Sequence, residues 1–172
     1  MLHFLDNSCL LCIDIQSDYK TLYRFEQFKK SVRKIVAKAR KEKILIVWIY
    51  EIDNDNSKWI YFWEELHGKR QRDKGIPYRF AKPLQTETIF IKNNYDAFSN
   101  KHLHIFLKKQ KVKNLYYIGL FTGVCVLNSI FSGFNLGYRI FLIEDGCTDK
   151  IKERHYSVIK QYQNYLFIKQ NI

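Results

Sequence analysis

The sequence of 172 residues contains little glycine and proline, with only seven Gly and two Pro. This scarcity excludes collagen-like repeats and leaves no glycine- or proline-rich segment that would serve as a linker. No shift in composition marks a domain boundary, and no internal repeat is visible. With 47% apolar and 16% aromatic residues, a chain of this length can bury roughly 70% of its unfolded surface. We therefore expect residues 1–172 to form one globular domain.

The sequence also lacks a hydrophobic run that is long enough to span a membrane. Its longest apolar stretches, Ile44–Tyr50 and Leu115–Leu120, are far shorter than the roughly 20 residues of a bilayer-spanning helix. The segment Met1–Asp6 has neither a basic lead nor a small-residue cleavage site. We therefore expect a cytoplasmic protein that makes no contact with a membrane.

Cysteine is scarce too, and the four residues of this type are too few for a disulfide framework in a chain of this length. Cys9 and Cys12 have the spacing of a redox motif, but they lie inside an apolar run and do not open a helix. We expect this pair to be structural.

Acidic residues are outnumbered, because 29 Lys and Arg face 17 Asp and Glu and give a formal net charge of +12. Much of this excess lies in residues 29–41, within a segment whose apolar residues recur every three or four positions from Phe25 to Ala39. This pattern predicts an amphipathic helix with a basic outer face. Because the sequence signatures of nucleic-acid-binding modules are absent, we expect no specific binding to nucleic acid, while anionic partners in general stay open.

Continuous apolar runs alternate with segments of helical periodicity along the chain. Such runs are typical of strands that are buried on both faces of a parallel sheet. The runs are Cys9–Ile13, Ile44–Tyr50, Thr88–Ile91, Leu115–Leu120 and Arg139–Ile143. We expect a last helix near Ile151–Tyr162 and an edge strand at Tyr165–Ile168. The alternation predicts an α/β fold, a three-layer α/β/α sandwich around a mostly parallel six-stranded sheet.

Three polar residues follow the predicted strands at their carboxyl ends, where α/β sheets hold their chemistry. Asp14 closes the first run, Lys92 closes the third, and Cys125 follows the fourth through a short turn. A helix start and a nearby ammonium would lower the pKa of the Cys125 thiol, and Asp14 would accept its proton. Taken singly, the three residues also suit a buried structural cysteine, a helix cap and a surface lysine.

Four segments of the sequence resemble motifs of the isochorismatase-like cysteine hydrolases. Leu11–Tyr19 resembles the opening strand motif, Ile89–Phe98 the lysine motif and Ile118–Val126 the nucleophile turn, and Gly137–Asp145 also fits. The resemblance extends from about residue 8 to about residue 150. The motifs stand in the order in which that family has them, which makes the set far more specific than any one motif.

This resemblance implies a catalytic triad of Asp14, Lys92 and Cys125 acting on a small molecule. It also implies a cis peptide bond before Phe121, with the backbone N–H groups of Phe121 and Cys125 forming an oxyanion hole. From the same motifs and the aromatic segment that follows the second run, we expect the substrate to contact a further set of side chains, namely Gln16, Tyr19, Trp59, Trp63 and Phe98.

The sequence departs from the family at the position where its nicotinamidases carry an Asp-x-His metal motif. Here the segment is Glu51–Asn56 and contains no histidine. His102 and His104 are two residues apart, whereas ligands on one helix face need a spacing of three or four. We therefore expect neither a metal site nor a cofactor.

Residues 53–82 are aromatic and basic, and the glycine- and proline-rich stretch that is usual in this family is missing. One interpretation is a lid that supplies aromatic walls and cationic groups to a planar or anionic substrate. The other is a contact with a partner subunit in a homo-oligomer, because Trp, Tyr and Arg are favoured at interfaces.

Taken together, these features lead us to expect a metal-independent cysteine hydrolase that cleaves a C–N bond in a small amide, ureido or carbamoyl compound through a Cys125 thioester. A vinyl-ether hydrolase of the isochorismatase type is the alternative within the fold. A non-catalytic protein that binds anionic partners with its basic surface is the alternative outside enzymology.

Overall fold

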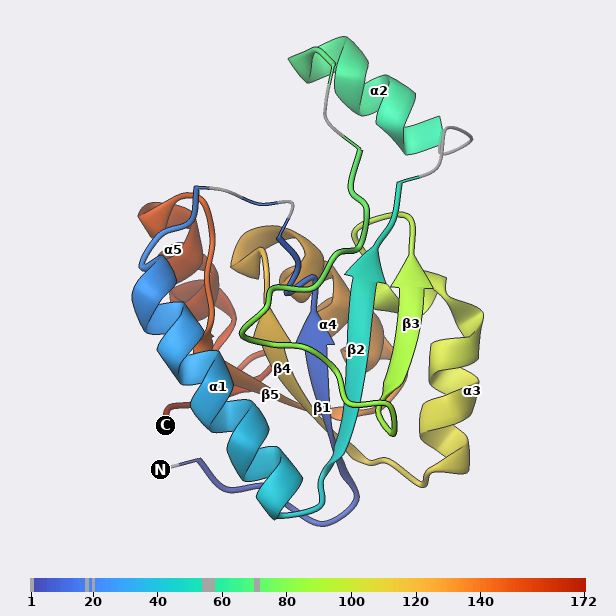
Figure 1. The fold of residues 1–172 in the computed structure, drawn as a ribbon, viewed down its shortest axis with the longest axis vertical. Coiled ribbons are helices and arrows are strands. Elements are labelled where there is room, and N and C mark those ends of the chain that lie inside the picture. The colour runs from blue at the N-terminus through green and yellow to red at the C-terminus, as the bar shows by residue number, and fades with distance from the viewer. Residues whose placement is uncertain (1, 18, 20, 54–57, 70–71) are drawn as a thin grey trace.

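A computed structural model describes residues 2–17, 19, 21–53, 58–69 and 72–172 of the chain. Strands and helices alternate along the described residues, as Figure 1 shows. The strands are β1 (Ser8–Ile13), β2 (Leu45–Glu51), β3 (Thr88–Lys92), β4 (Asn114–Gly119), β5 (Arg139–Cys147) and β6 (Ile168–Gln170). The helices are α1 (Phe25–Lys41), α2 (Lys58–His67), α3 (Lys101–Lys109), α4 (Leu127–Asn135) and α5 (Lys152–Tyr162), with a 3-10 turn at Ala97–Ser99 and a π-helical turn at Thr122–Val126.

The six strands form one sheet in the order β3-β2-β1-β4-β5-β6, and all of its strand pairs are parallel. Helix α1 covers one face, and α3 and α4 contribute to the core on the other. The predicted three-layer α/β/α sandwich is therefore confirmed. Because every crossover returns to the same end of the sheet, the carboxyl ends of the strands share one edge of the molecule.

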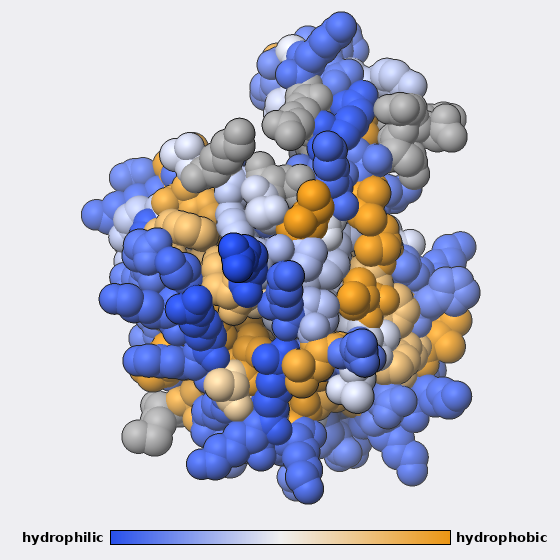
Figure 2. Space-filling model, in the orientation of Figure 1, coloured by the Kyte–Doolittle hydropathy of each residue, from blue (hydrophilic) through white to orange (hydrophobic). Residues whose placement is uncertain are grey.

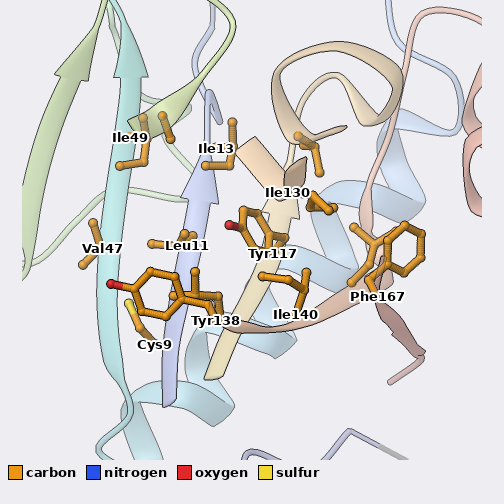
Figure 3. Close-up of a cluster of buried hydrophobic side chains, with 14 of the residues drawn as sticks. Cys9, Leu11, Ile13, Val47, Ile49, Tyr117, Ile130, Tyr138, Ile140 and Phe167 are labelled. Atoms are coloured by element: carbon orange, nitrogen blue, oxygen red, sulfur yellow. The ribbon is translucent and has the colours of Figure 1, made fainter. Parts of the chain in front are cut away.

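Burial on both faces explains why the central strands are continuous apolar runs. In β1, Cys9 and Leu11 belong to the core that α3 and α4 help to form, in one cluster with Tyr117 and Ile130 (Figure 3). Leu10 and Cys12 pack against the α1 side. Successive side chains of a strand point to opposite faces, so both faces need apolar residues. Cys9 and Cys12 are free thiols on opposite sides of the sheet, which agrees with a structural role.

Helix α1 has the predicted amphipathic character. Phe28, Val32 and Ile35 are fully buried, and Arg33 and Lys34 lie exposed between them. The space-filling view shows hydrophilic side chains along this helix (Figure 2). The basic residues of this segment thus form a solvated helix face.

The prediction for the last strand was wrong in position. The sequence predicted a strand at Tyr165–Ile168. In the structure, pairing with β5 starts only at Ile168 and continues to Gln170. Leu166 and Phe167 are buried. Leu166 belongs to a turn, in which its N–H donates to the Tyr162 carbonyl, and Phe167 forms an isolated bridge with Gln163 outside the sheet. Their apolar character reflects burial in the core and not pairing in the sheet.

Helix α2 projects from the carboxyl edge of the sheet, away from the body of the domain (Figure 1). Its Tyr61, Phe62 and Leu66 side chains are each about three-fifths exposed. A contact of this segment with a partner subunit in a homo-oligomer stays a prediction. None of the described helices is both long and apolar enough to cross a membrane.

Candidate active site

Polar residues end the first three strands and converge at the carboxyl edge of the sheet. Asp14 directly follows β1, and Glu51 and Lys92 are the last residues of β2 and β3, where they are paired in register. Cys125 lies in the π-helical turn that follows β4. All four residues are buried. The structure therefore brings together the three residues that sequence reasoning selected for catalysis.

The Lys92 ammonium is the centre of this cluster. Its Nζ atom lies 2.8 Å from Asp14 Oδ2 and 2.7 Å from Glu51 Oε2, and it donates to the Asn94 carbonyl oxygen at 2.8 Å. The Cys125 Sγ atom is 3.5 Å from the same nitrogen. Because the Lys92 side chain is fully buried, these neighbours replace the water that would otherwise solvate its charge.

Glu51 is a member of the cluster that sequence reasoning missed. The Cys125 thiol points at Glu51 Oε2 over 3.6 Å, and oxygen atoms of Asp14 and Glu51 lie within 4.8 Å of Sγ and of each other. Gln16 holds the Glu51 backbone, because its amide donates to the Glu51 carbonyl at 3.1 Å and accepts from the Glu51 N–H at 3.0 Å. Glu51 closes an apolar run just as Asp14 does, so the rule that selected Asp14 would have found it.

The buried charges shift the pKa values of the cluster. Burial raises the pKa of Asp14 to about 7, although Lys92 opposes this shift. Burial alone would lower the pKa of Lys92, but Asp14, Cys125 and Glu51 raise it overall, so the ammonium stays charged. Burial and the two carboxylates raise the pKa of the Cys125 thiol well above its usual value, despite the neighbouring Lys92.

The expectation of a low thiol pKa was therefore wrong. It counted one ammonium and a helix start but neither the full burial of the thiol nor the second carboxylate, Glu51. The resting site holds a neutral Cys125 thiol beside a charged Lys92. A nucleophilic role then requires a base that removes the thiol proton during the reaction, and Asp14 is placed to be that base.

The turn that carries Cys125 begins with a cis peptide bond between Leu120 and Phe121, as the resemblance implied. Gly119, just before it, has a φ of +136°, and a Cβ atom there would lie 2.0 Å from the Ile13 carbonyl oxygen. Only glycine allows β4 to pass so close to β1 at this point. The backbone N–H groups of Phe121 and Cys125 both belong to this turn.

The buried His155 side chain supports the turn that carries Cys125 through a hydrogen bond to Thr122. His155 Nε2 lies 3.0 Å from the Arg24 guanidinium, which can only donate, so the ring proton sits on Nδ1. Nδ1 then donates to Thr122 Oγ1 at 2.8 Å, and that hydroxyl donates to the Thr148 carbonyl. Burial and the Arg24 charge lower the pKa of His155 to about 4, so the ring is neutral at physiological pH.

The Cys125 side of the cluster opens into a pocket of about 340 Å³. Tyr19 and Trp63, whose contact with substrate stays a prediction, line this pocket. The Tyr19 hydroxyl donates to Asp73 Oδ2 at 3.0 Å. The whole set of lining residues is Tyr19, Glu51, Trp63, Asp73, Tyr95, Phe121, Val124, Cys125, Lys150 and Arg154.

Gln16 and Phe98, which were also expected to contact substrate, are not in the pocket lining. Gln16 is buried and holds β2, and Phe98 stacks on the Tyr138 ring at a centroid distance of 6.1 Å, away from the pocket lining. The Trp59 side chain lies outside the described residues.

Two sets of side chains in the described residues have the spacing of metal ligands, and Glu51 belongs to both. One set adds Asp53 and Asp73, and the other adds Asp14 and Cys125. Neither set includes a histidine, and zinc sites are built mainly from His and Cys. Glu51 Oε2 already binds the Lys92 ammonium, and Asp53 Oδ2 accepts the Asp73 N–H at 2.8 Å. These residues do not fit a nicotinamidase-type centre, and no step below involves a metal.

The chain thus combines a parallel α/β sheet with a buried acid–lysine–cysteine cluster at its carboxyl edge. The chain belongs to the isochorismatase family, since the model of the isochorismatase domain matches residues 8–168.

The relatives of the chain differ in what they are reported to do. The chain is 25% identical to a ureidoacrylate amidohydrolase of Cronobacter sakazakii over 81% of this chain and 74% of that protein. It is 24% identical to an Arabidopsis thaliana protein described as a probable inactive nicotinamidase, over 92% and 89% of the two chains. An isochorismatase-like hydrolase from Alkaliphilus metalliredigens has the same fold, with a TM-score of 0.83, 20% identity and coverage of 95% and 94%.

Proposed function

We propose that the protein is a cysteine hydrolase that cleaves a C–N bond in a small amide, ureido or carbamoyl compound through a thioester on Cys125. One observation carries this proposal: the Cys125 thiol faces a pocket on one side and the Asp14–Lys92 ion pair on the other. The ureidoacrylate amidohydrolase among the relatives supports a ureido group as one form of the substrate.

The first half of the reaction transfers the acyl group to sulfur. Asp14 takes the proton from the Cys125 thiol, and Sγ forms a bond to the carbonyl carbon while the carbonyl electron pair moves to oxygen. The N–H groups of Phe121 and Cys125 would hold that oxyanion, and preorganised donors of this kind lower a barrier by roughly 3 kcal/mol each. The C–N bond then breaks, and the amine leaves with the proton that Asp14 had accepted.

The second half uses water. Asp14, again a carboxylate, takes a proton from water as the water oxygen attacks the thioester carbon. The C–S bond then breaks, its electron pair returns to sulfur, and the Cys125 thiolate takes the proton back from Asp14 as a carboxylic or carbamic acid leaves. Lys92 keeps its charge throughout and stabilises both the Asp14 carboxylate and the developing thiolate. Glu51 holds the Lys92 ammonium in place.

The pKa of Asp14 also favours a second candidate, the hydrolysis of a vinyl ether. A carboxyl group with a pKa of about 7 is partly protonated at neutral pH and is suited to donate a proton to a substrate double bond. In that reaction Asp14 acts first as an acid, and covalent attack by Cys125 is not required.

A substrate panel tests the proposal. Small amides, ureides and carbamoyl compounds would be incubated with wild type and with Cys125→Ala, with isochorismate as the vinyl ether. We expect release of ammonia or amine by wild type and none by Cys125→Ala. Turnover of an amide by Cys125→Ala at the wild-type rate would contradict the proposal, and turnover of isochorismate alone by both proteins would favour the second candidate.

A further inference from the structure

Two cationic residues line the pocket beside Cys125, and both come from the start of α5. Lys150 lies two residues before this helix, and Arg154 is in its first turn. The lid segment was expected to supply the cationic groups, but its described residues in the lining are Trp63 and Asp73. Among the described residues, the cationic groups in the pocket lining are therefore Lys150 and Arg154.

The charge of Arg154 is already neutralised within the protein. Its Nε atom donates to Asp149 Oδ1 at 2.8 Å, and its Nη2 atom binds the same oxygen. Asp149 is fully buried, and its other oxygen accepts the Gly123 N–H at 2.9 Å. The Arg154–Asp149 pair thus supports the turn that carries Cys125. Because Asp149 offsets the charge of Arg154, this guanidinium attracts an anionic ligand less strongly than an unpaired cation would.

Lys92 is equally committed, because Asp14, Glu51 and the Asn94 carbonyl surround its ammonium. Lys150 differs from both of these cations. Within the described part of the chain, its ammonium has no acidic partner, and it lies 5.5 Å from the centre of the Phe121 ring. Phe121 also carries one of the N–H groups of the proposed oxyanion hole, and Lys150, Phe121 and Cys125 line the same pocket.

The acidic residues of the lining restrict where a charged ligand fits. Asp73 would repel an anion from its side of the pocket, whereas the charge of Glu51 is already paired with the Lys92 ammonium. A ligand that carries both a carbonyl and an anion therefore gains most when the carbonyl meets Cys125 and the anion meets Lys150.

We propose that the substrate carries a carboxylate within a few atoms of the scissile carbonyl, and that Lys150 is the specificity-determining residue that binds it. This inference rests on the proposed function, because it assumes that Cys125 attacks the substrate in this pocket. A neutral amide of the same shape would bind without this ion pair and react more slowly.

Two thiol reagents of nearly equal size serve as probes, because iodoacetate carries a carboxylate next to its reactive carbon and iodoacetamide carries a neutral amide. The rate at which each reagent alkylates Cys125 is measured by peptide mapping, and the ratio of the two rates is taken. Both reagents attack the same thiolate, so its concentration cancels in the ratio. The proteins compared are wild type, Lys150→Gln and the matched control Lys152→Gln, which removes the same charge from an exposed position outside the lining.

We expect the iodoacetate-to-iodoacetamide ratio to fall by about three- to tenfold in Lys150→Gln, as loss of one charge near the mouth of a pocket predicts. The ratio should stay at the wild-type value in Lys152→Gln. An equal ratio in wild type and Lys150→Gln would overturn the role of Lys150 while leaving Cys125 as the nucleophile. Failure of both reagents to label Cys125 in wild type would refute the reactive thiol of the proposed function, and the inference about its ligand would fall with it.

Discussion

Replacement of Lys92 by methionine tests whether its ammonium holds two buried carboxylates together. The side chain is fully buried with Asp14 and Glu51 at 2.8 and 2.7 Å. Removing one partner of a buried ion pair costs about 3–5 kcal/mol, because the remaining charge is left without compensation. One kcal/mol lowers the melting temperature of a domain of this size by roughly 2–4 °C. We therefore expect Lys92→Met to melt roughly 6–20 °C below wild type near pH 8.

The loss should be smaller at acidic pH. The pKa of Asp14 is about 7 in the folded protein and 3.8 as its ordinary value, so the folded state binds more protons between those values and stability falls as pH rises through them. Without Lys92 the pKa of Asp14 rises further, which extends the loss to higher pH. Below about pH 6 the carboxyl of the variant is neutral and its burial costs much less.

Thermal and urea unfolding of wild type and Lys92→Met near pH 5 and pH 8 provide the measurement. The exposed Lys152→Met variant is the control for loss of one positive charge, and Lys92→Met/Asp14→Asn should regain part of the lost stability because an amide carries no charge. An equal loss of unfolding free energy at both pH values, or a loss below about 1 kcal/mol near pH 8, would refute this reasoning.

Three further predictions concern the chemistry of the site. If Asp14 is the base, kcat/KM of wild type for an amide should rise with pH through about 7, and a fall over the same range would identify Asp14 as an acid. Iodoacetamide should label Cys125 before the other three cysteines, which have no exposed surface, and its rate should keep rising above pH 9 because the thiol pKa is raised; a plateau near neutral pH would contradict that. His155→Ala should lower the unfolding free energy by about 1–3 kcal/mol, since Thr122 and Arg24 lose a buried partner, and should lower kcat more than it raises KM; a normal kcat would show that the turn does not depend on His155.

Much of the fold was predictable because burial on both faces leaves a direct pattern in the sequence. The apolar runs Cys9–Ile13 and Leu45–Tyr50 lie in β1 and β2, and each is followed directly by a carboxylate of the site, Asp14 or Glu51. The same reasoning misplaced β6, because Leu166 and Phe167 are buried in the core without pairing in the sheet. An apolar run predicts that a segment is buried, but it does not show whether the segment pairs with a neighbouring strand.

The site itself was predictable in its members but less so in its electrostatics. Asp14 and Lys92 stand at strand ends and Cys125 in the short turn after β4, positions that the sequence shows. The thiol pKa depends on how many charges surround the sulfur in space. The strand-end rule that selected Asp14 was not applied to Glu51, so one of these charges was left out. Lys150 could not be selected from the sequence, because no motif or strand end marks it as a site residue. It lines the pocket because the segment between β5 and α5 places its ammonium near the Phe121 ring.

The central claim is that Cys125 becomes acylated during turnover, and intact-mass spectrometry tests it most directly. Wild type and Asp14→Asn would be mixed with the amide or ureide found active in the panel, quenched in acid within the first turnover, and weighed. We predict that wild type gains the mass of the acyl group, that peptide mapping places this group on Cys125, and that Asp14→Asn gains it far more slowly. Turnover of a C–N bond by wild type with no adduct at any time, together with undiminished turnover by Cys125→Ala, would contradict the account.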